Sequence, residues 1–176
     1  MKRAKVLLLA VALLLVLSSA TVFANGNVWW ESLSQVQRNQ QIVNGAWQDY
    51  GKTFDSWNGQ CKVWVQNMVH YNSVSQGHVW LPSNNPAPND WYWSNDPYYH
   101  DVGMSGGIES VQPGWIVQMH LTSGNAHTAV VVYKDSSGVG FIESNWPLGS
   151  YTVHYRYVTF SVFKSQVTMY SVHYIR

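Results

Sequence analysis

The chain of 176 residues is long enough for one ordinary domain and too short for two domains of typical size. Hydrophobic residues make up 46% and aromatic residues 15% of it, a composition that excludes intrinsic disorder. The formal net charge of +1 excludes the strongly basic surface of a nucleic-acid-binding domain.

The N-terminus has the pattern of a secretory signal peptide. A short basic segment precedes an apolar run at residues 6–16, and small residues follow it. The run is too short to span a bilayer, which takes roughly 20 residues. We therefore predict a signal peptide over residues 1–24 and a mature domain over residues 25–176, although cleavage after Ala20 also fits. The mature protein is expected to be secreted to the exterior or the cell wall, with no membrane attachment.

Helical patterns come first in the mature chain. Apolar residues at helical spacing predict a helix over residues 31–50, which Ser32 and Gln35 could cap. The expected apolar stripe of this helix consists of Leu33, Val36, Val43 and Trp47. A second helix is predicted over residues 61–73. Its expected buried stripe consists of Trp64, Val65, Met68 and Val69.

Residues 81–114 are rich in Pro, Asn and Gly and predict a long loop or a set of loops. Val-rich and Tyr-rich segments follow and predict β-strands. The expected strands lie at residues 115–121, 126–133, 139–146, 153–163 and 167–174. Helices followed by consecutive strands predict an α+β fold, with N-terminal helices packed on a C-terminal antiparallel β-sheet.

Cys61 is the only cysteine, so its thiol is a reactive group, half of an intermolecular disulfide or a small buried hydrophobe. Its predicted place at a helix start favours the thiolate, because unpaired backbone N–H groups stabilise negative charge there. The same groups could hold an oxyanion formed by attack on an amide. A nearby histidine would lower the thiol pKa further. Among seven histidines, His127 stands out because it opens an otherwise apolar strand.

The predicted hairpin after His127 suggests partners for its ring. If Tyr133 pairs with Val139, Asn145 lies opposite His127 and Glu143 becomes its diagonal neighbour on the same face. A slip of one residue would place these groups on different faces. The alternative from the residues alone is that Glu143 and Asn145 are ordinary polar residues at the end of a strand.

Aromatic residues gather in the predicted loop, among them Trp91, Trp93 and Tyr98. Their side chains could stack on sugar rings or hold a peptide, as the linings of binding pockets do. Alternatively they fold back over the core, because a small domain with ten tryptophans must bury many of them.

Three segments together resemble the CHAP family of cysteine, histidine-dependent amidohydrolases and peptidases. They are GQC at residues 59–61, AHTAVV at 126–131 and IESNW at 142–146. The family is akin to the NlpC-type cell-wall peptidases, and the resemblance implies a papain-like fold.

The resemblance also implies roles for single residues. It makes Cys61 the nucleophile and His127 the base, with Glu143 orienting the histidine and Asn145 as an alternative or additional orienter. Gln60, beside the nucleophile, would help shape the oxyanion site. No metal and no other cofactor is expected.

The resulting prediction is a monomeric, secreted cysteine amidase or endopeptidase. The resemblance implies peptidoglycan as substrate, and another extracellular peptide or glycopeptide fits the same chemistry. Two alternatives remain: a non-catalytic secreted module that binds glycan or protein, and a thiol acyltransferase that passes the acyl group to an amine.

Overall fold

A computed structural model describes residues 30–72, 99–103 and 107–176, and it confirms the α+β class. The helices are α3 (Gln35–Asp49), α4 (Cys61–Asn72), the short 3₁₀ turn η2 (Ile108–Ser110) and α5 (Phe160–Gln166). The strands are β1 (Tyr99–Gly103), β2 (Ile116–Leu121), β3 (Ala126–Lys134), β4 (Gly138–Glu143), β5 (His154–Thr159) and β6 (Val167–Ile175).

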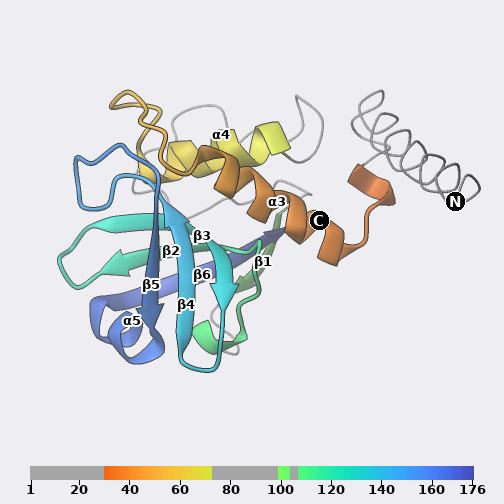
Figure 1. Cartoon of the computed structure of the whole chain (residues 1–176). Helices are drawn as coiled ribbons and strands as arrows, with labels where there is room; N and C mark the ends of the chain where they lie inside the picture. The colour runs from red at the N-terminus through yellow and green to blue at the C-terminus, as the bar shows by residue number, and fades with distance from the viewer. Residues whose placement is uncertain (1–29, 73–98, 104–106) are drawn as a thin grey trace, which may run out of the picture.

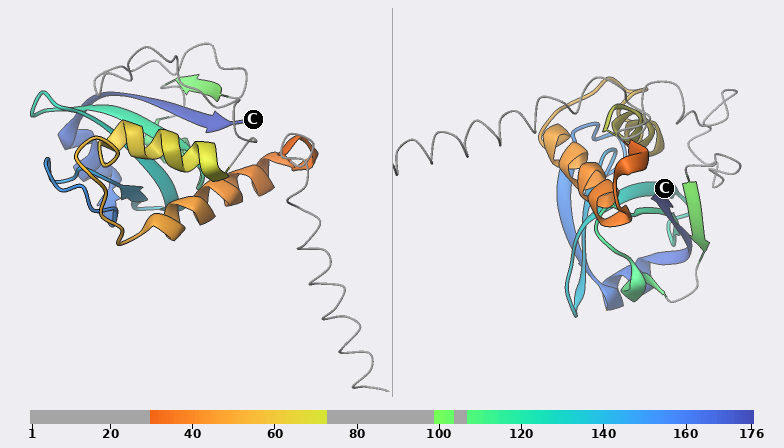
Figure 2. Two further views of the ribbon diagram at one scale, coloured as in Figure 1. Left: turned by 90° about the horizontal axis from the view of Figure 1, so that it is seen from above. Right: turned by 90° about the vertical axis from the view of Figure 1, so that its right-hand side faces the viewer.

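The described strands form one antiparallel sheet in the order β1-β6-β2-β3-β4-β5. Strands β2 to β5 follow one another as a meander, and the last strand, β6, returns to lie between β1 and β2. Helices α3 and α4 pack against each other and cross the same face of the sheet (Figures 1 and 2). The N-terminal helices therefore pack on the sheet, as predicted.

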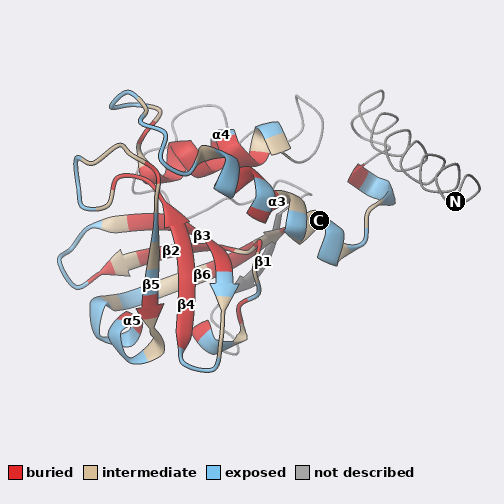
Figure 3. Cartoon of the chain, in the orientation of Figure 1, coloured by how far each residue is buried: buried red, intermediate tan, exposed pale blue. Residues whose placement is uncertain are grey.

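Both faces of the central strands are buried (Figure 3). One face packs under the two helices and includes Ile116, Val130 and Ile142. The opposite face includes Val131 and Phe141 and is covered in part by Phe163 of α5. Side chains that alternate along a strand point to opposite faces, so β3 and β4 contribute to both cores.

Helix α3 begins later than predicted, because the capping box lies two residues further along the chain. Ser-x-x-Gln occurs twice in this segment, and the structure uses Ser34 and Gln37 in place of Ser32 and Gln35. The backbone N–H of Ser34 donates to Gln37 Oε1 at 2.9 Å, and Gln37 N donates back to Ser34 Oγ at 3.4 Å. The prediction of a capping box is therefore confirmed, but the residues predicted to form it were wrong.

The predicted apolar stripe of this helix is confirmed at Val43 and in part at Leu33, which packs against the same core, and is wrong at its other two residues. Ile42, Val43 and Ala46 are buried against the sheet, whereas Val36 is 79% exposed and Trp47 45% exposed. The predicted stripe of α4 is correct, since its apolar residues are buried under α3 and on β3.

Two predicted segments form other structures. The strand predicted over residues 153–163 ends at Thr159, whose Oγ1 accepts the N–H of Val162 at 3.3 Å and caps α5. The helix carries Phe163 into the core. Within the loop predicted over residues 81–114, the structure forms strand β1 and the turn η2.

The β3–β4 hairpin has the predicted register at the end near His127. Val130 pairs with Ile142 and Val131 pairs with Phe141, and both pairs have the predicted register. At the turn, however, Tyr133 pairs with Gly140 and not with Val139, because a bulge after Val131 shifts the ladder by one residue.

Candidate active site

Cys61 is the first residue of α4, and a tight turn directly precedes it. The Asp55 carboxylate accepts the N–H groups of Trp57 and Asn58 at 2.9 and 2.8 Å, and Asp55 O accepts the N–H of Gly59. A Cβ on Gly59 would lie 2.5 Å from Tyr151, so only glycine fits there. The turn thus sets the position of the cysteine that follows it.

A second contact joins this turn to the sheet. Ser144, directly after β4, donates its hydroxyl to Gly59 O at 2.7 Å, and both groups are buried. The start of α4 is therefore fixed against the end of the strand that carries Glu143.

The thiol of Cys61 meets the imidazole of His127, which projects from the beginning of β3. The two side chains are hydrogen-bonded, and backbone N–H groups of Thr128 and Lys62 also face the sulfur. Both Cys61 and His127 are buried, with 3% and 4% of their surface exposed. The structure thus brings the predicted thiol and the predicted base into direct contact.

Glu143 lies on the other side of the imidazole. Its Oε2 is 2.8 Å from His127 Nε2, which leaves Nδ1 as the ring nitrogen that faces Cys61. The carboxyl group is fully buried. Cys61, His127 and Glu143 thus form a continuous chain of thiol, imidazole and carboxylate, contributed by α4, β3 and β4.

Two residues of β5 complete the surroundings of the carboxylate. Arg156 donates from Nη2 to Glu143 Oε2 at 3.0 Å and from Nε to Oε1. His154 Nε2 lies 3.4 Å from Oε1. In the sheet, His154 pairs directly with Glu143. Neither residue was predicted as part of the site, although this cross-strand pairing follows from the alternation of β4 and β5.

The pKa values of the three groups shift toward a charged triad. Burial alone would raise the pKa of Cys61, but the hydrogen bond and the charge of His127 lower it overall. Burial likewise opposes charging of His127, yet its bonds to Cys61 and Glu143 raise its pKa to about 9. The pKa of Glu143 falls far below its usual range despite burial, because His127, His154 and Arg156 bind the carboxylate. The arrangement favours a thiolate–imidazolium pair at neutral pH.

Asn145 does not contact the imidazole. Strand β4 ends at Glu143, and Asn145 follows with a positive φ of 62°, so it does not continue the strand as predicted. Its Nδ2 donates to Gln60 Oε1 at 2.8 Å, and its Oδ1 accepts the N–H of Gly149 at 2.7 Å. Asn145 therefore braces the loop beside the helix start, while Glu143 holds the ring.

Gln60 is anchored at both ends of its side-chain amide. Its Oε1 accepts from Asn145, and its Nε2 donates to Ser56 O at 3.1 Å. Its backbone carbonyl accepts the N–H of Trp64 at 2.8 Å and so opens the helix. Gln60 therefore lies beside the nucleophile, as the sequence order requires. Its side-chain amide has two N–H donors, and only one of them is used in the bond to Ser56.

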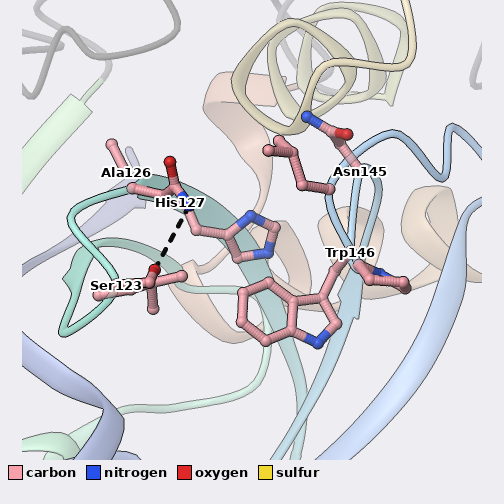
Figure 4. A pocket seen from close by; sticks show the side chains of 9 residues that line it. Ser123, Ala126, His127, Asn145 and Trp146 are labelled. Carbon is pink, nitrogen blue, oxygen red and sulfur yellow. Dashed lines mark hydrogen bonds between the residues drawn. The ribbon is translucent and has the colours of Figure 1, made fainter.

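A pocket of about 180 Å³ opens beside His127 (Figure 4). The indole of Trp146 lies against the imidazole with ring centres 5.3 Å apart, and Asn145 lies across the pocket from it. The remaining lining residues are Leu121, Ser123, Asn125, Ala126, Pro147 and Leu148. Apart from His127, none of these side chains carries a charge.

Some predicted features fall outside the described residues, namely Trp91, Trp93, Tyr98 and the signal peptide. Among the residues that are described, no three His, Cys, Asp or Glu side chains gather as a metal site would require. Within the same part of the chain, no helix has both the length and the apolar character needed to cross a bilayer.

No protein-family model and no curated protein sequence matches the chain. Solved structures that are similar in fold include two of Ly7917. The crystal structure of Ly7917 aligns with a TM-score of 0.52 at 19% identity, and that of Ly7917 with the hydrolyzing product of MDP aligns with a TM-score of 0.53 at 18% identity. Each alignment covers 76% of this chain and 61% of the other, so the chain spans less than two thirds of that protein's length. At such identities, the likeness shows a shared fold alone.

Proposed function

We propose that the chain is a secreted cysteine amidase or endopeptidase of the papain-like, CHAP-type class, which cleaves an amide bond in peptidoglycan. The observation that carries this proposal is the buried contact chain from the Cys61 thiol through His127 to Glu143. A thiol with a lowered pKa beside a buried histidine and carboxylate is the arrangement that nucleophilic catalysis by cysteine requires. A binding module needs no such arrangement.

In the first half of the reaction, the Cys61 thiolate attacks the carbonyl carbon of the amide. The new C–S bond forms as the carbonyl electron pair moves to oxygen. When that pair returns, the C–N bond breaks, and the Nδ1 proton of His127 passes to the departing amine. The acyl group is then held as a thioester on Cys61.

In the second half, water replaces the amine. His127, now neutral, takes a proton from the water as its oxygen bonds to the acyl carbon. The C–S bond breaks, the carboxylic acid product leaves, and the thiolate–imidazolium pair is restored. Glu143 keeps Nδ1 directed at the sulfur and stabilises the imidazolium, without taking up a proton itself.

The oxyanion would be held at the start of α4. The first turn of a helix has backbone N–H groups without helical acceptors, and these point toward the nucleophile. The free amide N–H of Gln60 would add a donor, with Asn145 holding the Gln60 side chain in place. Asn145 thus serves the oxyanion side of the site in this proposal, and not the histidine.

Peptidoglycan is the proposed substrate for two reasons. The fold is similar to that of Ly7917, whose structure has been solved with the hydrolyzing product of MDP, a peptidoglycan fragment. The signal-peptide pattern of residues 1–24 would in addition export the enzyme to the compartment where peptidoglycan lies. The uncharged pocket beside His127 would receive a neutral part of the stem peptide or of its muramoyl attachment.

Digestion of purified cell walls tests the proposal, with new amino groups counted and products identified by mass spectrometry. The wild type should release fragments, whereas Cys61→Ser and His127→Ala should not. His70→Ala, at the far end of α4, is the matched control and should retain full activity.

Three outcomes would contradict the proposal. Equal release by wild type and Cys61→Ser would mean that the thiol is not the nucleophile. Wall binding without release would indicate a binding module. Products that carry an added amine, in place of a new carboxylic acid, would identify an acyltransferase.

A further inference from the structure

Arg156 connects the catalytic carboxylate to the wall of the pocket. On one side its guanidinium makes two bonds to Glu143, from Nε to Oε1 and from Nη2 to Oε2 at 3.0 Å. On the other side it lies over the indole of Trp146, 4.7 Å from the ring centre. Trp146 in turn lies against His127 in the pocket. A single side chain thus contacts both the group that orients the base and the ring that packs on the base.

The carboxylate of Glu143 needs such support because one bond does not fix it. The terminal torsion of a glutamate is broad, so a single bond from His127 would leave the two oxygens free to rotate. The planar fork of an arginine binds both oxygens at once and holds the carboxylate in one orientation. In that orientation Oε2 is the atom that His127 meets.

The same contact keeps a buried charge ionised. Glu143 is fully buried, and an ionised carboxyl group in such a place must be paired. The groups that face it are His127 from β3 and both His154 and Arg156 from β5, with Cys61 of α4 beyond the imidazole. Of these, Arg156 alone binds both carboxylate oxygens through a guanidinium.

We propose that Arg156 is a positioning residue of the active site, which holds Glu143 in the orientation that directs His127 at Cys61 and anchors Trp146 as the pocket wall. The inference rests on the proposed thiol chemistry. It adds a fourth member to the chain of contacts: the guanidinium acts on the reaction through Glu143 and Trp146 and does not touch the reacting atoms.

The test is the rate at which iodoacetamide alkylates Cys61 as a function of pH, in the wild type, Arg156→Gln and Arg156→Lys. Without the guanidinium, Glu143 is free to rotate and no longer directs the imidazolium at Cys61, so the thiolate loses its stabilising partner and takes up a proton at higher pH. We expect the acid limb of the Arg156→Gln profile to move up by about one pH unit, so that alkylation on that limb is slower by about tenfold. Arg156→Lys retains the positive charge but not the planar fork of donors, so its alkylation profile should lie between those of the wild type and Arg156→Gln.

Arg38→Gln is the matched control, because Arg38 also stacks on a tryptophan, Trp30, but belongs to the start of α3. Its profile should match the wild type. A purely structural role of Arg156 would lower the folded fraction and leave the acid limb in place, and this result would overturn the inference.

If Arg156→Gln fails to fold, Arg156→Lys decides: a raised acid limb supports the inference, and a wild-type profile refutes it. Alkylation requires no peptidoglycan. A wild type that alkylates rapidly but digests no wall would therefore contradict the proposed substrate while leaving the test of Arg156 intact.

Discussion

Replacing Glu143 with glutamine removes one charge and almost no volume from the centre of the site. The pKa of His127 is about 9, against an ordinary value of 6.5. That difference corresponds to roughly 3 kcal/mol in favour of the imidazolium. Cys61 and Glu143 both contribute hydrogen bonds and charge to it. If they share it about equally, Glu143→Gln removes roughly 1.5 kcal/mol and lowers the pKa of His127 by about one unit.

The pKa of His127 can be measured by NMR titration of ¹⁵N-labelled histidine rings, with the His127 signals assigned by their absence from a His127→Ala spectrum. The imidazolium should then be up to about tenfold less populated than in the wild type above pH 9, and the turnover of Glu143→Gln should fall there by up to the same factor while changing little at mildly acidic pH. Glu109→Gln is the control, because Glu109 pairs with Lys164 on the surface, away from the site. An unchanged His127 pKa in Glu143→Gln would refute the electrostatic account of the site.

Three further predictions concern stability and binding. The free energy of unfolding should decline as pH falls below about 4.5, the ordinary pKa of Glu143, because the stabilisation from the lowered pKa of this group in the folded state is lost there. The free energy of unfolding should also decline as pH rises from 6.5 through about 9, because His127 loses its proton over this range. Thermal unfolding across pH would show a flat profile if neither group is coupled to folding. Trp146→Ala should raise KM for wall fragments by roughly tenfold while changing kcat less, because it removes one wall of the pocket; a change in kcat alone would argue against that role. Ser144→Ala should lower the free energy of unfolding in urea by about 1–2 kcal/mol, because Gly59 O loses its buried donor; an unchanged value would mean that water replaces the hydroxyl.

The parts of the site that the sequence could predict were those governed by local pattern. Cys61 begins a helix because a turn precedes it and a buried stripe follows it, and both signals are local. The register that brings Glu143 beside His127 follows from strand alternation near the site. The bulge after Val131 leaves no comparable signal, because the turn and the packing of the sheet decide where the ladder shifts.

The parts that could not be predicted depend on contacts between distant segments. Asn145 looked like a continuation of β4, but its bond to Gln60, 85 positions away, needs the backbone turned to positive φ. Arg156 and His154 lie within a correctly predicted strand, yet their role depends on which strand lies beside β4. Helix α5 replaced only the last residues of the strand predicted over residues 153–163, where Thr159 caps the helix although the residues that follow favour a strand.

The proposed chemistry requires Cys61 to exist as a thiolate paired with the imidazolium of His127. The difference in ultraviolet absorbance between the wild type and Cys61→Ala, followed across pH, measures the thiolate directly. We expect this absorbance to be present already at mildly acidic pH, well below the ordinary thiol pKa of about 8.5, and to appear only at higher pH in His127→Ala. A thiolate that appears only near about pH 8.5, with or without His127, would show that the two side chains form no ion pair.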